Sequence, residues 1–166
     1  MIAVVTGGLG FIGSHLTRRL CDDGHHVIVI DNCSSGRMDR RDPRCPTLDT
    51  DIASPITDEI PCDVVYHLAA TARIPKSFAD PKGCLKNNYL STLYALDLCR
   101  CNKAAMIFAS TSACDGDPTA NPYAMSKKMG EDLCFFYGKT YGLSVAVARL
   151  YNVYGPDQDE TGDNAT

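Results

Sequence analysis

A cluster of glycines near the start of the chain constrains the fold more than any other feature. Residues 2–5 form a short apolar run typical of a buried strand, and glycines follow at positions 7, 8, 10 and 13, where a helical pattern begins. Glycine allows a tight turn, close approach of backbone to a phosphate, and close packing of helix on strand. The spacing Gly7-x-x-Gly10-x-x-Gly13 differs from the common G-x-G-x-x-G fingerprint, so a glycine-rich turn of another α/β protein stays an alternative here.

Apolar patterns after the glycines predict strands that alternate with helices. Strands are expected at 27–30, 47–50, 63–68, 104–109 and 143–150, and helices at 11–23, 55–60, 81–102 and 123–141. The segment 32–46 is expected to be a loop with one helical turn, and 115–122 a short polar loop. The prediction is an α/β fold: a Rossmann-type, doubly wound parallel sheet of three layers and about six strands.

Composition narrows the classes of partner. The 166 residues are enough for one domain, which we expect over 1–155, followed by an acidic tail at 156–166. A net charge of −4 gives no basic surface for nucleic acid, and no apolar run is long enough to span a membrane. The N-terminus enters a strand with no signal segment before it, so a cytoplasmic location is expected.

The chain has nine cysteines, an odd and large number, and none forms a C-x-x-C pair. We interpret most of them as small buried apolar residues in a reducing compartment. Only Cys99 and Cys101 approach the spacing of metal ligands, and positions two apart on a helix point in different directions. No metal site is therefore expected.

Chemistry-bearing residues fall at the ends of predicted strands, where parallel sheets bind ligands. Asp31 ends the second strand, about 20 positions after the glycines, where an acidic residue typically binds the adenosine ribose of NAD and repels the 2′-phosphate of NADP. Thr111 follows the fifth strand, and Tyr123 and Lys127 lie four apart on one helical face. A neighbouring ammonium is expected to lower the pKa of the phenol, so that Tyr123 can deprotonate an alcohol while hydride passes to NAD. A surface Tyr–Lys pair without function is the alternative.

Eight segments in order give the chain a family resemblance: TGGLGFIGSHL from Thr6, VIVIDNCSSG ending at Gly36, DI at Asp51, HLAA from His67, NNYLST from Asn87, ASTS from Ala109, PYAMSK ending at Lys127, and RLYNVYGP from Arg149. With these the chain resembles the N-terminal, NAD-binding part of the extended short-chain dehydrogenase/reductase family, which includes sugar-nucleotide epimerases and dehydratases.

The resemblance implies a role for each matching residue. The pyrophosphate would lie against Gly7, Gly10, Phe11, Ile12 and Gly13, and the adenosine ribose against Asp31, Asn32, Ser35 and Gly36. Asp51 and Ile52 would bracket the adenine, Leu68, Ala69 and Ala70 would line the path of the cofactor, and Asn88 would tie its helix to the sheet near the site. Thr111, Tyr123 and Lys127 would be the catalytic residues, Tyr123 and Lys127 would also contact the cofactor, and Thr111 and Asn152 would bind the substrate.

Within that family the resemblance favours an NAD-dependent 4-epimerase of a sugar nucleotide, with a UDP-sugar expected. The dehydratases usually have Asp-Glu after the catalytic threonine, whereas this chain has Ser112-Ala113. A 4,6-dehydratase or reductase, and an NAD-binding remnant or scaffold without turnover, stay as alternatives. The family also pairs through helices equivalent to 84–102 and 123–141, which would place Tyr94, Cys99, Phe135 and Phe136 in a homodimer interface.

Three features depart from the family pattern. Cys114-Asp115-Gly116 stands where the family usually has Val-Tyr-Gly, and the loops 37–50 and 115–122 are short. The chain also ends soon after Pro156, whereas the sugar-nucleotide pocket of the family is mostly formed by a further C-terminal segment. The tail 156–166 would be the start of that segment.

Overall fold

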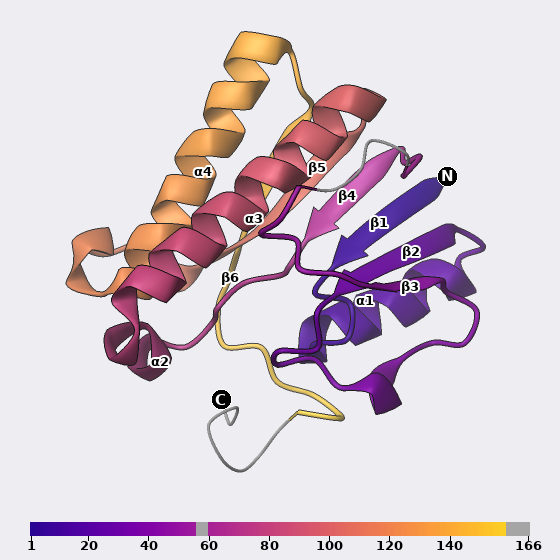
Figure 1. Cartoon of the computed structure of the whole chain (residues 1–166), viewed down its shortest axis with the longest axis horizontal. Coiled ribbons are helices and arrows are strands. Elements are labelled where there is room, and N and C mark those ends of the chain that lie inside the picture. Colours follow the sequence, from indigo (N-terminus) through magenta and orange to yellow (C-terminus); the bar gives the residue numbers. More distant parts are fainter. Residues whose placement is uncertain (56–59, 159–166) are drawn as a thin grey trace.

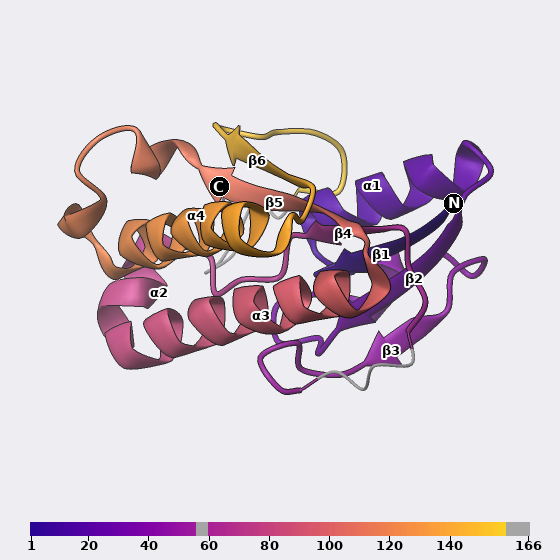
Figure 2. The same ribbon diagram turned by 90° about the horizontal axis from the view of Figure 1, so that it is seen from above.

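The computed structural model describes residues 1–55 and 60–158, and these form a parallel sheet with helices on both faces (Figures 1 and 2). The sheet has six strands in the order β3-β2-β1-β4-β5-β6. The strands are β1 (Ile2–Thr6), β2 (His26–Asp31), β3 (Thr47–Asp49), β4 (Val64–His67), β5 (Ala105–Thr111) and β6 (Val145–Leu150). The α-helices are α1 (Phe11–Asp22), α2 (Ile74–Ala79), α3 (Pro81–Asn102) and α4 (Pro122–Tyr141). The predicted fold class is confirmed.

The two faces of the sheet are covered unevenly. Among the described elements, α1 lies on one face while α3 and α4 pack side by side on the other (Figure 2). Alternate residues of β1 supply both sides: Val4 joins the core under α3 and α4, and Ala3 and Val5 join the core under α1. The central strands are therefore apolar on both faces, which explains why their sequences are continuous apolar runs.

The long helices begin and end where local chemistry favours it. Asp80 accepts a hydrogen bond from the N–H of Gly83 at 2.9 Å, and Asn121 accepts one from the N–H of Ala124 at 2.8 Å. Each cap is followed by a proline, whose fixed φ suits the first helical position. Gly142 ends α4 in the left-handed conformation, with φ +69°. None of the described helices combines the length and the apolarity that crossing a membrane requires.

Several predicted elements need correction. Helix α2 was not expected, because its six residues include a proline and carry no apolar period. Strand β5 continues through Ser110 and Thr111, which the sequence placed after the strand. The polar loop 115–122 contains a 3₁₀ turn at Pro118–Ala120, and the expected turn inside 32–46 lies at Met38–Arg40. The helix expected at 55–60 lies mostly outside the described residues, as does most of the tail 156–166.

Candidate cofactor and catalytic site

The glycines after β1 form a cradle in which side chains have no room. Gly7 has φ +70°, and a Cβ added there would lie 2.8 Å from the backbone nitrogen of Ala69. A Cβ on Gly13 would lie 2.1 Å from the carbonyl oxygen of Gly7. The first turn of α1 therefore packs directly on the turn after β1, as close approach of helix and strand requires.

The start of α1 offers backbone donors. Gly10 caps the helix without a side-chain hydrogen bond, and its own N–H donates to the carbonyl oxygen of Gly7 at 3.1 Å. In an α-helix the first N–H groups have no intrahelical acceptor, which here concerns Phe11, Ile12 and Gly13. These donors at the positive end of the helix dipole fit the pyrophosphate of a dinucleotide. The donor set and the glycine cradle together are suited to NAD.

Asp31 is fixed at the carboxyl end of β2. Its side chain is buried, and its two carboxylate oxygens accept hydrogen bonds from the N–H groups of Leu9 at 3.0 Å and Cys33 at 2.9 Å. A Cβ on Gly36 would lie 2.7 Å from one of these oxygens. Asp31 therefore joins the glycine turn to the loop after β2. Each carboxylate oxygen can accept a second hydrogen bond, so both are available to hydroxyl donors.

The other residues assigned to the adenosine end lie around this carboxylate in different environments. Asn32 and Ser35 are exposed on the loop after β2. The carboxylate of Asp51 accepts from the N–H of Ala53 at 2.9 Å, and Ile52 is buried in the core under α3 and α4. Loop and core residues thus meet at one edge of the sheet.

A chain of buried hydrogen bonds runs from the glycine turn to α3. The N–H of Ala69 donates to the hydroxyl of Thr6 at 3.2 Å, and that hydroxyl lies 2.8 Å from Nδ1 of His67. Nε2 of His67 lies 3.4 Å from the hydroxyl of Thr92, which donates to the carbonyl oxygen of Asn88 at 2.8 Å. Burial lowers the pKa of His67 to about 3, so the ring is neutral. Because the hydroxyl of Thr92 donates to Asn88, it acts as an acceptor toward Nε2, which assigns the ring proton to Nε2. The sequence assigned His67 no role in the site, and its role here is structural.

Asn88 connects three elements at the side of the site. Its side-chain oxygen accepts a hydrogen bond from the backbone N–H of Thr71 at 2.7 Å. Its side-chain NH₂ group donates to the backbone carbonyl oxygen of Thr71 and to the hydroxyl of Ser126, the latter at 2.8 Å. Ser126 in turn donates to the carbonyl oxygen of Tyr123 at 2.7 Å. Asn88 thus links the segment after β4 to the first turn of α4, next to Leu68, Ala69 and Ala70.

Tyr123 lies in the first turn of α4, near Thr111 at the end of β5. Burial raises the pKa of Tyr123, while the hydroxyl of Thr111 and the charge of Arg73 act in the opposite direction. The expectation that the pKa of Tyr123 is lowered by Lys127 is therefore wrong for this structure. Desolvation outweighs the nearby charges.

Lys127 lies one turn after Tyr123 and is buried. Its ammonium donates to the carbonyl oxygen of Ala109 at 2.8 Å and lies 4.9 Å from the ring centre of Phe108. Burial lowers the pKa of Lys127 to about 8. Its charge is thus held by β5, beneath the strand end that carries Thr111.

The buried Glu131, one turn beyond Lys127, was not predicted from the sequence. It accepts hydrogen bonds from Ser110 at 2.6 Å and from two nitrogens of Arg149 at 2.8 and 2.7 Å. Arg149 also donates to Asp115 at 2.6 Å, and Asp115 accepts from Tyr151 at 2.5 Å. Arg149 lowers the pKa of Glu131. The i, i+4 step from Lys127 was the available signal, because Tyr123, Lys127 and Glu131 share one face of α4.

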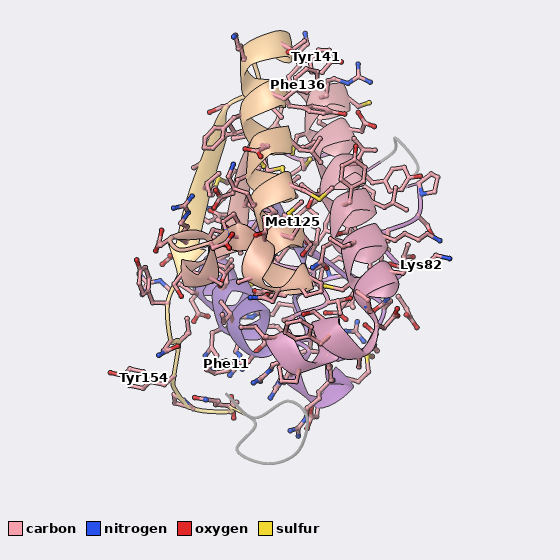
Figure 3. All side chains as sticks on the ribbon, turned by 90° about the vertical axis from the view of Figure 1, so that its left-hand side faces the viewer. Phe11, Lys82, Met125, Phe136, Tyr141 and Tyr154 are labelled. Carbon is pink, nitrogen blue, oxygen red and sulfur yellow. The ribbon has the colours of Figure 1, made fainter. Side chains whose placement is uncertain are left out.

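The segment after β6 returns to the glycine cradle. The imidazole of His15 lies 2.9 Å from the carbonyl oxygen of Pro156, Arg40 donates to that of Asp157 at 2.6 Å, and a Cβ on Gly155 would lie 3.7 Å from the ring of Phe11. Figure 3 shows Phe11 and Tyr154 on this side of the molecule. Asn152, in the same segment, is exposed.

The cysteines are distributed largely as expected, with two corrections. Cys99 is fully buried and Cys101 is exposed, so they point apart. The burial of Cys99 inside the chain contradicts its predicted place in a dimer interface. Cys21, Asp42 and Cys45 have ligand-type atoms within 4.8 Å of one another, a grouping that their spacing in the sequence did not reveal.

Comparison with known proteins gives the family of the chain. The model of the NAD-dependent epimerase/dehydratase family matches residues 3–166. The UDP-glucuronic acid decarboxylase 1 of Xenopus tropicalis is 35% identical over 92% of this chain. The crystal structure of the UDP-glucose 4-epimerase of Thermotoga maritima with UDP-glucose has a TM-score of 0.91 and 32% identity over the whole chain. That of the Thermus thermophilus UDP-glucose 4-epimerase complex with NAD has a TM-score of 0.86 and 32% identity over 99% of it.

The chain spans 41% of the length of the frog decarboxylase and 60% of each of the two epimerase structures. The matched part contains the glycine cradle, the sheet and the helix that carries Tyr123 and Lys127. This chain therefore belongs to the NAD-dependent epimerase/dehydratase family, a family of enzymes.

Proposed function

We propose that this chain is the cofactor-binding and catalytic part of an NAD-dependent 4-epimerase that acts on a UDP-sugar. The observation that carries the proposal is the proximity of Tyr123 to Thr111, with Lys127 buried one turn away from Tyr123. These groups come from the carboxyl end of β5 and the start of α4, and Asn88 ties that start to the segment after β4. A base and an oxygen-binding hydroxyl thus lie at the sheet edge where the glycine cradle opens.

Each side chain has a defined task in the proposed reaction. Tyr123 removes the proton of the sugar C4 hydroxyl, and Thr111 donates a hydrogen bond to the same oxygen. NAD, when bound, accepts the C4 hydride and later returns it to the other face of the ring. Lys127 contacts the cofactor, and Asp31 holds the adenosine ribose.

Decarboxylation of a UDP-uronic acid is the second candidate, favoured by the frog relative. Both reactions begin with the same oxidation at C4, and a 4-keto group makes a carboxyl group on C5 a β-keto acid that loses CO₂. Ser112-Ala113 offers no acid–base pair after Thr111, which supports epimerisation over dehydration. Dehydration needs an acid and a base after the oxidation at C4, and the side chain of Ala113 has no ionisable group that could serve as either.

The test begins with calorimetric titration of the chain with NAD⁺ and, as control, NADP⁺. Selective NAD⁺ binding is expected, and no binding to a folded sample would contradict the proposal. The chain is then incubated with UDP-glucose or UDP-glucuronic acid, and the products are identified by NMR. UDP-galactose supports the epimerase, UDP-xylose with CO₂ supports the decarboxylase, and binding without turnover supports a scaffold. Tyr123→Phe is expected to abolish turnover while NAD⁺ binding persists.

We also propose a homodimer formed by α3 and α4. Phe135 and Phe136 are 56% and 52% exposed, and Met125, Phe136 and Tyr141 lie along the outer surface of α4 (Figure 3). Burying these rings would stabilise an association of two copies. A monomeric mass by light scattering at high concentration would contradict the dimer.

The free thiols of the described cysteines also fit a reducing compartment such as the cytoplasm.

A further inference from the structure

Two cysteines that are distant in the sequence lie together behind the adenosine side of the site. Cys21 is in the last turn of α1, and Cys45 lies just before β3. Their sulfur atoms and a carboxylate oxygen of Asp42 are within 4.8 Å of one another. Within residues 1–55 and 60–158 no other group of three or more such ligand side chains is found.

The two thiols differ in access. Cys45 is 1% exposed and packs in the core under α1 with Leu20 and Val29. Cys21 is half-buried and lines a surface pocket of about 480 Å³ together with Arg44. A small reagent can therefore reach the thiol of Cys21 directly, whereas the buried thiol of Cys45 can react only with a sulfur that Cys21 presents to it.

The carboxylate makes a metal centre unfavourable at this place. Arg44 donates to both oxygens of Asp42, at 2.9 and 2.6 Å, and also to Asp22 at 2.8 Å. Asp42 is therefore already neutralised, and a cation would lie beside a guanidinium. Two sulfurs alone do not fill a tetrahedral zinc site, but they suffice for a disulfide.

We propose that Cys21 and Cys45 form a reversible intramolecular disulfide, which makes this pair a redox-sensitive site. The sulfurs must approach to about 2.05 Å, a movement within reach of side-chain rotation and a small shift of the loop. The bond would fasten the segment 32–46, which follows Asp31 and contains Asn32, Ser35 and Gly36, to the helix that carries the pyrophosphate donors.

The reaction is a two-step exchange with an oxidised low-molecular-weight disulfide such as glutathione disulfide. The thiolate of Cys21 attacks one glutathione sulfur, and one glutathione thiolate leaves. Cys45 then attacks the sulfur of Cys21 and expels the second glutathione. Two cysteine thiols lose two electrons and two protons, and the reagent is reduced to two glutathione molecules. Burial raises the pKa of Cys45 to about 12, so Cys45 does not begin the exchange; its attack as the thiolate depends on the proximity of the sulfur of Cys21.

The test uses the full chain in a series of glutathione redox buffers, followed by blocking of free thiols and tryptic peptide mapping. Cleavage after Arg19 and Arg44 separates the two cysteines into peptides 20–37 and 45–73. Oxidation is expected to join these peptides with loss of two hydrogen atoms. Peptide 20–37 also contains Cys33, and 45–73 contains Cys62, so each variant Cys33→Ser and Cys62→Ser should keep the link.

Cys21→Ser and Cys45→Ala should each abolish the link, and Cys101→Ser, which removes an exposed cysteine of α3, should leave it intact. Oxidation should raise the thermal midpoint of the wild type and leave that of Cys21→Ser unchanged. A link that persists without Cys21 would overturn the proposal. So would stoichiometric Zn²⁺ retention by the reduced wild type but not by Cys21→Ser, combined with no linked peptide, because the pair would then be a metal site.

Discussion

The two halves of the sheet build their parts of the site by different means. In the β1–α1–β2 half the backbone forms the site: glycines without room for a Cβ, N–H groups at a helix start, and one carboxylate held by backbone donors. In the β5–α4–β6 half side chains form it, and they include the buried ions Lys127 and Glu131. Substitutions of the glycines in the first half should therefore act by steric clash, and substitutions of the buried ions in the second half should act through charge.

The same contrast appears in the two cores. The core under α1 contains apolar residues and Cys45, packed around β1 and β2. The core under α3 and α4 has Phe108 beneath the ammonium of Lys127, with Glu131 one turn away. Burying an ion lowers the free energy of unfolding unless the ion is paired. A site that needs buried ions such as Lys127 and Glu131 is therefore less stable than an apolar core of the same size.

Gly13→Ala should have the largest effect. The new Cβ would lie 2.1 Å from the carbonyl oxygen of Gly7, and neither backbone segment can move without opening the cradle. We expect a loss of about 3 kcal/mol in the free energy of unfolding, together with loss of NAD⁺ binding. Urea unfolding and calorimetry measure both. Gly116→Ala is the control, because a Cβ there meets no atom within 4 Å. Equal effects of the two changes would refute the spatial account.

Glu131→Gln should come next, with a loss of roughly 2–3 kcal/mol, because Arg149 and Ser110 lose a charged acceptor. The pKa of Glu131 is lowered from its ordinary value of 4.5, so its contribution is present above that pH and is lost as the pH falls through the lowered value. The difference from wild type should therefore shrink in acid. The exposed neighbour Asp132, paired with Lys128, is the control: Asp132→Asn should change stability by less than about 0.5 kcal/mol.

Lys127→Met should stabilise the chain while removing turnover. The buried ammonium has a pKa of about 8 against an ordinary 10.5, so the unfolded chain binds more protons between these values. The wild-type free energy of unfolding should rise with pH across that window. The gain of the variant, about 2 kcal/mol at neutral pH after loss of one hydrogen bond, should disappear by its upper end. Urea unfolding at several pH values measures this, and a constant gain at every pH would show that packing alone is responsible.

Asp31→Asn should have the smallest effect, seen mainly in cofactor choice, because the asparagine oxygen keeps one of the two backbone hydrogen bonds that the carboxylate accepts. Removing the carboxylate removes its repulsion of a 2′-phosphate, so the preference for NAD⁺ over NADP⁺ should narrow about tenfold, or about 1.4 kcal/mol. Asp49→Asn is the control, because Asp49 pairs with Asp31 across β2 and β3 and is exposed. An equal change in both variants would indicate a general effect of net charge.

The parts of the fold that follow from periodicity were predictable. The succession of strands and helices along the chain and the bounds of α3 were obtained from the sequence because apolar periods and prolines mark them locally, and the glycine turn was marked by its glycines. Helix α2 was missed because its six residues owe their conformation to neighbours. The Glu131–Arg149 pair depends on contact between elements 18 residues apart, and nothing in its local sequence indicates a partner.

The direction of the Tyr123 pKa shift shows the same limit. Spacing places Lys127 on the same face as Tyr123, but only the structure shows that its ammonium is bonded to Ala109. Likewise, the sequence suggested that Cys99 faces outward on α3, and packing buries it. A pattern can predict the face of a helix, but which group a side chain reaches on that face depends on tertiary packing.

Strand β6 has a consequence for how the chain behaves at high concentration. Among residues 1–55 and 60–158 it is the edge strand of the sheet beside β5, and its exposed residues include Ala146 and Ala148. An edge strand presents free backbone donors and acceptors and is a template for intermolecular strand pairing. The charge of Arg149 near its end opposes such stacking, so solubility in this region depends on the same residue that pairs with Glu131.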